Sequence, residues 1–380
     1  MATGSTTAST SSSAPTRNSS VCCGRALETR RRCLEYPGHL RLQAAPLPAP
    51  LHLAWGLAAA RGLGPGGRRA AARLLRHLKR TGFDLPTEQT VAQLLDTTNQ
   101  PSPLRPLVWE ALCYAALNTP PESASARIFA HVLRDSLAAG AHASDLLIPR
   151  VDLSELFPVP AARYLARHGG RVEVAAPIRG IAAEDAGFRL HGDHRDRRFA
   201  QVVIATAPYH ATALLPAAPE LEALRNGIDA LPYEPITTVY LAFDSGVRLP
   251  QPMVGVAKGC AQWLFDRGQL AGPSGMIAAV ISAHGPHESL DRDELIAAVL
   301  ADIAAIVGPL PPLAWHQAIT ERRATIAARP GLARPGNLTA TPGLWLAGDY
   351  LASDYPATLE SAVRSGVQCA RQIRAAGARR

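Results

Sequence analysis

The residues best suited to chemistry lie in one short run near the C-terminus. Gly343–Asp349 reads Gly-Leu-Trp-Leu-Ala-Gly-Asp, which predicts a short apolar strand ending in glycine and aspartate. Gly348 would let the backbone approach a bulky ligand closely. The Asp349 carboxylate could accept hydrogen bonds from sugar-type hydroxyls, while its backbone N–H could meet a phosphate. The run therefore predicts a binding site for a ligand that carries both kinds of group.

A long helix is predicted directly after this strand. Pro356 would stand in its first turn, where proline fits best, and apolar residues recur behind it every three or four positions. They are Leu359, Ala362, Val363, Gly366, Val367, Ala370 and Ile373. Free N–H groups at Ala357, Thr358 and Leu359 would form a positive pole. Such a pole could stabilise negative charge, for example on a reduced flavin ring.

The elements that would position this run are predicted in the middle of the chain. Val202–Ala205 is a continuous apolar run that leads into Thr206, which is typical of a buried strand. Further strands are expected at 172–174, 178–181, 188–190, 236–243 and 277–282, and helices at 161–168 and 291–306.

The first half of the chain has a helical pattern. Residues 40–80 are predicted as helices with a break at Gly62–Gly67, which formally matches G-x-G-x-x-G. We interpret the break as a helix–helix turn, because a dinucleotide fingerprint needs a buried strand before it and Pro65 removes one N–H donor. Residues 86–140 continue as helices.

The most apolar helix of this half is Leu104–Leu117. It is expected to end at Asn118, which precedes Thr119-Pro120-Pro121, a stop signal. Within this helix Trp109, Cys113 and Tyr114 are interpreted as core residues.

Composition excludes several classes of protein. Of 380 residues, 47% are hydrophobic, so the chain is globular. The net charge of +8 comes almost entirely from arginine, and aromatic residues make up 5%, so we expect no nucleic-acid binding. Six cysteines without a C-x-x-C pair predict neither a zinc site nor a disulfide framework. No Ser/His/Asp spacing or P-loop is present.

Two segments carry open interpretations. The basic residues between Arg68 and Arg80 form either a solvated helix face or a face that meets anionic lipid. Residues 1–35 are rich in serine and threonine, and are expected to be a disordered or misread N-terminus, with a transit peptide as the alternative. No segment predicts a transmembrane helix.

At the C-terminal run the chain resembles a known family. Gly343–Ala362 resembles the C-terminal flavin-binding signature of the amine oxidase and phytoene desaturase superfamily. Other segments are similar to the squalene-associated FAD-dependent desaturases, also called hydroxysqualene dehydroxylases, from about residue 36 onward. These segments are Glu110–Cys113, Ala116–Glu122, Arg134–Leu137, Ser144–Ser154, Tyr233–Leu241, Gln262–Arg267 and Glu321–Thr325.

The resemblance implies FAD as cofactor and assigns residues to it. Gly348 and Asp349 would meet the ribityl–pyrophosphate portion, and residues 357–359 would lie under the isoalloxazine ring. Ile178 would contact adenine through its backbone, and Thr206 would line the same domain. Ordinary sheet packing is an equally open interpretation of Ile178 and Thr206. Glu360 and Arg364 are instead interpreted as an i,i+4 helix pair.

The fold implied is a two-domain α/β flavoprotein with interleaved segments. The FAD-binding domain is expected at 141–230 and 331–380, and the substrate domain at 36–140 and 231–330. Family members begin with a strand, a true G-x-G-x-x-G and a helix, whereas nothing before residue 36 fits this βαβ unit. The chain is therefore expected to lack it, either as a shortened or frame-shifted translation or as a genuine fragment.

The reaction implied is reductive loss of a hydroxyl from hydroxysqualene, an apolar isoprenoid, to give squalene. It needs an acid, an apolar tunnel and the flavin N5 against the reacting carbon. Helices between residues 47 and 137 would form the tunnel. Asp145, Asp152 and Glu110 are candidates for the acid, although a helix cap or a surface salt bridge is the preferred interpretation of each.

Two alternatives remain open at this stage: a carotenoid-type desaturase, and a non-catalytic fragment or scaffold that associates with other squalene-synthesis enzymes. A cytoplasmic protein is expected, with peripheral contact to the inner membrane surface.

Overall fold

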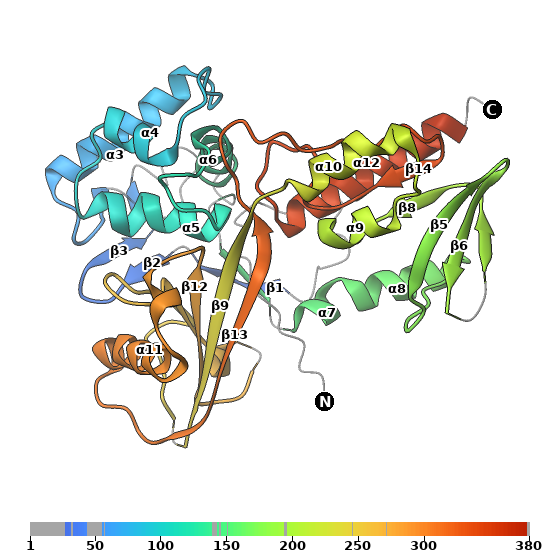
Figure 1. The fold of residues 1–380 in the computed structure, drawn as a ribbon. Helices are drawn as coiled ribbons and strands as arrows, with labels where there is room; N and C mark the ends of the chain where they lie inside the picture. Colours follow the sequence, from blue (N-terminus) through green and yellow to red (C-terminus); the bar gives the residue numbers. More distant parts are fainter. Residues whose placement is uncertain are drawn as a thin grey trace. The chain divides into compact units, whose positions relative to one another are not determined.

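The computed structural model describes residues 27–31, 33–43, 55–56, 58–138, 143, 146–149, 151–193, 196–244, 246–270 and 272–377. The chain divides into two compact units, each built from two separate stretches of sequence (Figure 1). Unit 1 comprises Met1–Tyr164 and Tyr233–Pro330, and unit 2 comprises Leu165–Pro232 and Gly331–Arg380. The units divide after residues 164, 232 and 330, and the domain boundaries predicted from the sequence lie after residues 140, 230 and 330. Most of the predicted N-terminal segment, 1–35, lies outside the described residues.

Unit 1 is organised on a five-stranded sheet in which all neighbouring strands are antiparallel. Its order is β10-β11-β12-β9-β13. The strands are β9 (Tyr233–Phe243), β10 (Met253–Gly255), β11 (Trp263–Asp266), β12 (Met276–Ser282) and β13 (Leu313–Ile326). The strands predicted at 236–243 and 277–282 are therefore confirmed as β9 and β12. Strands β10, β11 and β13 were not predicted.

The two faces of this sheet bury different cores, because side chains alternate between faces along each strand. On one face, residues such as Val239, Leu264 and Ile277 pack against α11 (Arg292–Val307). This helix confirms the prediction at 291–306. It begins at a capping box, in which Asp291 accepts from the Glu294 N–H at 2.9 Å.

The other face of the sheet packs against a helical cluster. Trp263, Phe265 and Ala278 point to this side and join the same core as Leu74 and Phe129. The helices are α3 (Pro65–Arg80), α4 (Val91–Thr97), a π-helical segment (Arg105–Glu110) continuous with α5 (Ala111–Leu117), and α6 (Ala126–Leu133) followed by a π-helical turn (Arg134–Ala138). The sheet and the helices thus share one large apolar core.

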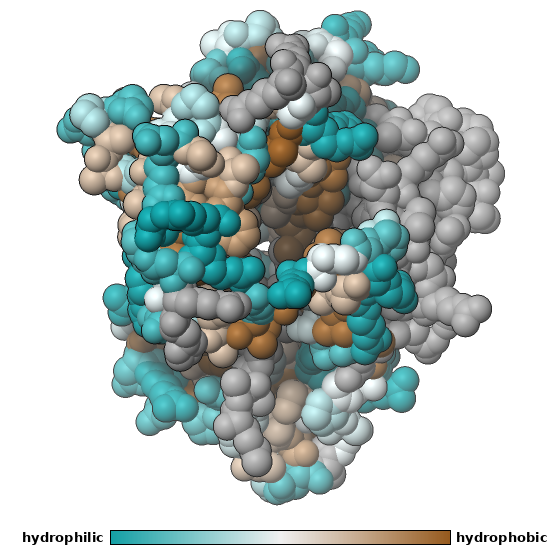
Figure 2. All heavy atoms as spheres, turned by 90° about the vertical axis from the view of Figure 1, so that its right-hand side faces the viewer, coloured by the Kyte–Doolittle hydropathy of each residue, from teal (hydrophilic) through white to brown (hydrophobic). Residues whose placement is uncertain are grey.

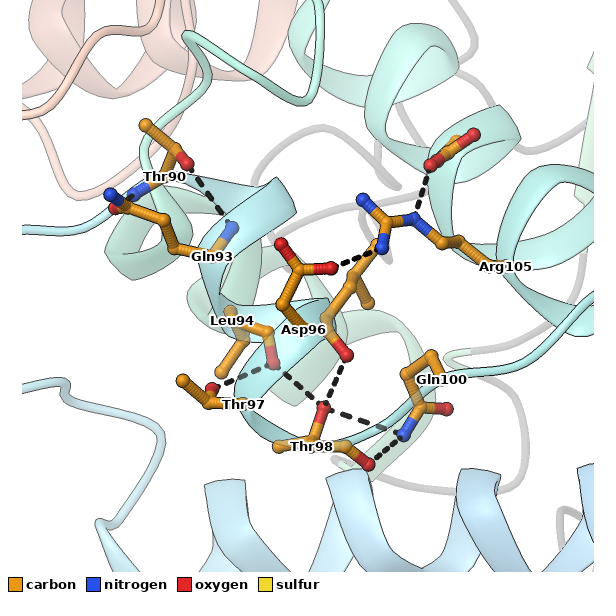
Figure 3. A network of polar contacts seen from close by, with 10 residues as sticks. Thr90, Gln93, Leu94, Asp96, Thr97, Thr98, Gln100 and Arg105 are labelled. Atoms are coloured by element: carbon orange, nitrogen blue, oxygen red, sulfur yellow. Dashed lines mark hydrogen bonds and ion pairs between the residues drawn. The ribbon is translucent and has the colours of Figure 1, made fainter.

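A polar network, partly buried, fixes α4 to its neighbours within this cluster (Figure 3). Gln100 Nε2 donates to the Ala70 carbonyl at 3.0 Å, and its Oε1 accepts from Trp109 Nε1 at 2.9 Å. Arg105 is paired with Asp96 on α4 and, at 2.6 Å, with Glu110. Trp109 and Cys113 are almost fully buried, as predicted, whereas Tyr114 is half-buried.

The helical prediction for 40–80 is wrong at its start. Residues Leu40–Gln43 form strand β3, which pairs with β2 (Cys33–Tyr36) in a hairpin. The reason is local: Gly38, at φ 73°, allows the tight turn, after which Leu40 and Leu42 alternate with polar residues. The break at Gly62–Gly67 does begin a helix, since Gly64 caps α3 and Pro65 is its first residue.

The rest of unit 1 includes a second two-stranded pairing, of β1 (Leu27–Arg31) with β4 (Leu146–Pro149). Helix α7 (Leu153–Leu156) follows, and α8 (Pro158–Arg167) crosses the division between the units and covers most of the helix predicted at 161–168.

The described residues of unit 2 form two small sheets and, after α8, further helices. Its antiparallel sheet has β5 (Ile178–Glu184), β6 (Gly187–Gly192) and β7 (Arg197–Phe199); its parallel pair has β8 (Val202–Ile204) and β14 (Leu344–Leu346); its helices are α9 (Pro208–Leu214), α10 (Glu222–Asp229) and α12 (Leu359–Gly377). The strand predicted at 172–174 is wrong, since Val172 and Val174 are 55% and 85% exposed and have no strand partner in the described part of the chain. Their alternation alone could not form a strand without a neighbour.

On the face in Figure 2, hydrophilic side chains form much of the outer layer among the coloured residues, and apolar side chains lie mainly behind them. Among the described residues, every helix is too short or too polar to cross a membrane.

Asn118 joins the helical cluster to the sheet of unit 1. It ends α5 in a left-handed conformation (φ 45°), which confirms the predicted stop. Its side chain is 6% exposed and donates to the Pro235 carbonyl at 3.2 Å and to Thr325 Oγ1 at 2.9 Å, while Oδ1 accepts from the Ala283 N–H at 2.9 Å. One side chain therefore contacts β9, β13 and the end of β12.

We predict that Asn118→Ala lowers the free energy of unfolding by about 2 to 4 kcal/mol, because it removes the buried side-chain hydrogen bonds to Pro235, Thr325 and Ala283 and forces a Cβ-bearing residue without a polar side chain into the left-handed region. Urea unfolding followed by circular dichroism measures the change. Asn118→Gly is the matched control, since it loses the same hydrogen bonds without the backbone strain and should be about 1 kcal/mol less destabilised than the alanine variant. Equal stability of wild type and Asn118→Ala would contradict the role of Asn118 in joining the helical cluster to the sheet.

Candidate functional site

The predicted C-terminal site starts from the parallel pair of unit 2. Leu344 pairs with Val202 and Leu346 with Ile204, and the ladder continues through the Ala347 N–H, which donates to the Ile204 carbonyl at 3.0 Å. Parallel strands end at the same edge of their sheet, and ligands of α/β folds bind beyond that edge. The residues that follow β8 and β14 therefore emerge side by side.

Gly348 turns the chain where β14 ends. A Cβ on this residue would lie 2.5 Å from Cε1 of Tyr350, whose side chain is fully buried, so no larger residue fits. The Gly348 N–H donates to Ser365 Oγ of α12 at 3.0 Å. Asn337 Nδ2 donates to the same Ser365 oxygen at 3.1 Å and to the Leu346 carbonyl at 2.8 Å. Strand, turn and helix are thus held in one arrangement.

Asp349 follows as a half-buried carboxylate. Burial raises its pKa above the ordinary aspartate value, while the backbone N–H groups of Asp349 and Tyr350 and the charge of Arg334 act in the opposite direction. The carboxylate is therefore a hydrogen-bond acceptor in a partly desolvated position, where it can accept from the hydroxyl groups of a ligand. In this structure the Asp349 N–H faces its own carboxylate, so the predicted phosphate contact of that N–H stays a prediction.

Arg334 organises the loop between β14 and α12, a role that sequence reasoning missed. Its guanidinium donates to the carbonyl of Tyr355 at 2.8 Å, to the carbonyl of Ser353 and, more weakly, to that of Asp349 at 3.4 Å. Burial lowers the Arg334 pKa, and the nearby Asp349 and Asp354 charges oppose that shift. Three carbonyls distant in sequence from Arg334 meet only once the loop is folded, so no local motif could have indicated this contact.

Helix α12 begins later than predicted. Its first helical residue is Leu359, and the Ala362 N–H donates to the Thr358 carbonyl at 3.0 Å, so Pro356 precedes the helix. The cause is the Pro356 carbonyl, which accepts from Ser361 Oγ at 2.7 Å and from Thr358 Oγ1 at 3.3 Å and keeps the chain in a turn. The four N–H groups without an intrahelical acceptor at the start of α12 are consequently those of residues 358–361. This set includes the predicted Thr358 and Leu359, whereas Ala357 precedes the helix.

The remaining predicted cofactor residues fall in two places. Thr206 is exposed directly after β8, at the same strand edge as Gly348. Ala357 is buried, Thr358 is half-buried and Leu359 is 57% exposed along the loop that leaves this edge.

Ile178 lies elsewhere, because it opens β5 in the antiparallel sheet opposite Gly192. Among the described strands no pairing joins that sheet to β8 and β14. The structure therefore brings Thr206 to the edge where Gly348 and Asp349 lie, and leaves the adenine contact of Ile178 as a prediction.

The predicted pair of Glu360 and Arg364 is confirmed, with Nε 2.7 Å from Oε1. The Arg364 guanidinium also lies 4.2 Å from the centroid of the Tyr355 ring. Because Tyr355 belongs to the loop that Arg334 holds, this cation–π contact ties α12 to that loop.

The three acid candidates have different outcomes. Glu110 is ion-paired with Arg105 at 2.6 Å. Asp152 caps α7 and accepts from the N–H groups of Ser154 at 2.8 Å and Glu155 at 3.0 Å. The salt-bridge and cap interpretations are thereby confirmed for these two residues, and Asp145 lies outside the described residues.

The residues at this edge fit a flavin nucleotide. The turn at Gly348 has no room for a side chain, Asp349 supplies a hydroxyl acceptor, and the first turn of α12 supplies N–H donors for negative charge. No group of three or more metal-ligating side chains occurs within the described part of the chain.

Comparison with known sequences also indicates a flavin-binding protein. The family described as "Flavin containing amine oxidoreductase" matches residues 26–374. The chain is 32% identical over 269 residues to a protein of Sinorhizobium fredii named hydroxysqualene dehydroxylase, covering 68% of this chain and 60% of that protein. It is also 32% identical over 289 residues to a protein of the same name from Rhodopseudomonas palustris, covering 74% and 65%. The chain thus spans about three fifths of the length of these relatives.

Among solved structures, a putative protoporphyrinogen oxidase from Exiguobacterium is similar with a TM-score of 0.61 at 17% identity, covering 92% of this chain and 82% of that one. At this identity the likeness concerns the fold alone. It agrees with the α/β fold that the sequence predicted.

We predict that Gly348→Ala lowers the melting temperature and abolishes flavin retention, because the new methyl group must displace the buried Tyr350 ring that shapes the turn. Differential scanning fluorimetry and the flavin released on denaturation measure both effects. The control is Gly366→Ala in the middle of α12, where a Cβ meets nothing within 4 Å. This control should be neutral or stabilised by up to about 1 kcal/mol, since alanine favours a helix over glycine. Normal flavin content in Gly348→Ala would show that the turn is not part of a cofactor site.

Proposed function

We propose, from the premise that this chain belongs to the flavin containing amine oxidoreductase family, that it acts in an FAD-dependent conversion of hydroxysqualene to squalene by reductive dehydroxylation. The observation that carries the proposal is the similarity to relatives named hydroxysqualene dehydroxylase. It is supported by the strand–Gly348–Asp349–helix arrangement described above. Because the chain spans only part of those relatives, the reaction itself belongs to the proposal.

The chemistry replaces an allylic C–OH bond by a C–H bond. Bound in reduced form, FAD would supply the hydride, and the hydroxyl would leave with a proton as water. Within this chain, Gly348 would give the cofactor close access to the backbone, Asp349 would accept from its hydroxyl groups, and the start of α12 would stabilise negative charge.

The substrate would bind against the apolar core of unit 1. This core contains large apolar side chains such as Leu74, Phe129 and Phe265. An isoprenoid chain gains about 0.8 kcal/mol for each CH₂ group that it buries in such surroundings. Water is excluded from such a core. Departure of the hydroxyl there therefore needs a hydrogen-bond donor that stabilises the leaving oxygen.

We predict that the chain, purified and supplied with FAD and a chemical reductant, converts hydroxysqualene to squalene, detected by gas chromatography and mass spectrometry. Arg334→Met should lower flavin content and turnover together, because it releases the loop carbonyls of Ser353 and Tyr355. Arg371→Met, an exposed change on α12, is the control and should behave as wild type.

The same assay separates the alternatives. Turnover of phytoene with oxidised flavin, and none of hydroxysqualene with reduced flavin, would replace the proposal by a carotenoid-type desaturase. A chain that retains no FAD and turns over neither substrate would refute catalysis by this chain and leave the non-catalytic alternative, in which it associates with other squalene-synthesis enzymes.

We further propose that the protein works as a peripheral protein on the inner membrane surface, through the outer face of α3. One face of this helix is buried by Ala70, Leu74 and Leu78, and the opposite face is basic. Arg68 and Arg73 donate to carbonyls of their own unit and have a structural role. The other basic side chains remain exposed: Arg69, Arg76, Lys79 and Arg80.

We predict that replacing these four residues by glutamine weakens binding to phosphatidylglycerol vesicles at least tenfold, since each cation near an anionic surface contributes about 1 kcal/mol. Vesicle sedimentation at low and at high salt measures the effect. The control variant replaces Arg163, Arg167, Arg322 and Arg371, four exposed arginines scattered over the chain, by glutamine. Equal losses in the two variants would mean that net charge, and not α3, determines binding.

A further inference from the structure

Two polar groups are buried without a partner in the apolar layer of unit 1. Tyr36, from β2, is 2% exposed, and Trp263, from β11, is 5% exposed. Neither the Tyr36 hydroxyl nor the Trp263 indole N–H has a hydrogen-bond partner among the residues that the structure describes. Their ring centroids lie 5.8 Å apart, with the planes tilted by 47°. The two unpartnered groups thus belong to a single aromatic contact.

The surroundings hold this contact in place. Gly255 pairs with Trp263 across β10 and β11, and a Cβ on Gly255 would lie 2.2 Å from Cε1 of Tyr36. The Tyr36 ring therefore packs onto the sheet at the one residue of that strand that lacks a side chain. Leu40, Phe265 and Ala278 belong to the same buried apolar core as the two rings.

Buried hydroxyl and N–H groups without a partner are unfavourable unless a ligand or a water molecule supplies the missing hydrogen bond. A buried donor without an acceptor loses its hydration and gains nothing, and in folded proteins such donors are rare outside functional sites. Two of them in one contact indicate a ligand that supplies the missing acceptor. Burial also raises the Tyr36 pKa above that of an ordinary tyrosine, so the phenol stays neutral and keeps its proton.

We propose that Tyr36 and Trp263 form a hydroxyl-binding subsite that accepts the oxygen of an apolar alcohol within the layer between sheet and helices. An indole N–H can only donate, whereas a phenol can donate or accept, and an alcohol oxygen offers two lone pairs and one proton. A charged ligand is disfavoured because it is costly to bury a charge in an apolar core. A metal ion is disfavoured because neither indole nor neutral phenol is a good ligand.

This inference rests on the proposed function and adds to it the residues that recognise the alcohol. The subsite binds the substrate by the group that the reaction removes. The hydrocarbon product offers no acceptor, so both donors are left unpaired again when the hydroxyl has gone. The subsite would therefore favour the alcohol over the hydrocarbon and assist release of the product.

Equilibrium dialysis of the full chain against farnesol, and against the matched hydrocarbon farnesene, tests the subsite. Tyr36→Phe and Trp263→Phe should each weaken farnesol binding about five- to tenfold, since each removes one hydrogen bond. Both variants should leave farnesene binding within twofold of wild type. The control is Tyr164→Phe on α8, an exposed tyrosine that should leave both affinities unchanged.

Thermal unfolding without ligand gives an independent measurement. Tyr36→Phe should melt at the same temperature as wild type or higher, because it removes a hydroxyl that has no partner. Gly255→Ala, which pushes the Tyr36 ring aside, should weaken farnesol binding in the same way. A lowered melting temperature of Tyr36→Phe together with unchanged farnesol affinity would overturn the proposal, since it would show that the hydroxyl is bound within the protein or to a buried water.

Turnover of hydroxysqualene separates this inference from the proposed function. Loss of farnesol binding in Tyr36→Phe supports the subsite even if the wild-type chain makes no squalene, in which case the proposed reaction alone fails. Conversely, squalene formation by a Tyr36→Phe variant with unchanged farnesol affinity leaves the reaction standing and refutes the subsite.

Discussion

Unit 2 depends on the pairing of β8 with β14, two strands of three residues each from the two separate stretches that build this unit. A parallel pair of this length contributes few hydrogen bonds, so packing must support it. Leu344 and Leu346 are fully buried, and Trp345 Nε1 donates to Gln201, 144 residues earlier, at 2.6 Å. Because this pairing sets the strand edge, it also sets where Gly348, Asp349 and Thr206 emerge. The candidate cofactor site therefore depends on a long-range contact.

A second constraint acts on the loop beyond this edge. A loop that curls around a ligand turns several carbonyls inward, and their mutual repulsion opposes the curl. Arg334 resolves this by donating to the carbonyls of Ser353 and Tyr355. Its positive charge also lies close enough to Asp349 to oppose the effect of burial on that carboxyl. One cation thus serves both the backbone of the loop and the electrostatics of its acidic residue.

How far the sequence could predict this molecule depended on the range of the interactions involved. Elements with a strong local pattern, such as α11 with its capping box and the stop at Asn118, were predicted within a few residues. Strands β10 and β11 were missed because they are short and are specified by their neighbours in the sheet. The start of α12 was misplaced because the side chains of Thr358 and Ser361 bind the Pro356 carbonyl, a local competition that a proline rule does not consider. In the site of unit 2, Gly348 and Asp349 were recognisable as a motif, whereas Arg334 acts through contacts that only the fold creates. The contact between Tyr36 and Trp263 in unit 1 likewise joins residues far apart in the sequence.

The central sheet of unit 1 is covered on both sides, but its two cores differ in kind. The core beneath α11 is closed by residues of the strands and the helix, such as Val239, Ile277 and Val299. The core on the other side contains the Tyr36 and Trp263 donors, which have no partner among the described residues. The sheet thus separates two environments. The side beneath α11 holds the strands in register through aliphatic packing, so the other side can carry the energetic cost of these two donors. A division of labour of this kind lets a protein change what it recognises on one face of a sheet while its stability is maintained from the opposite face.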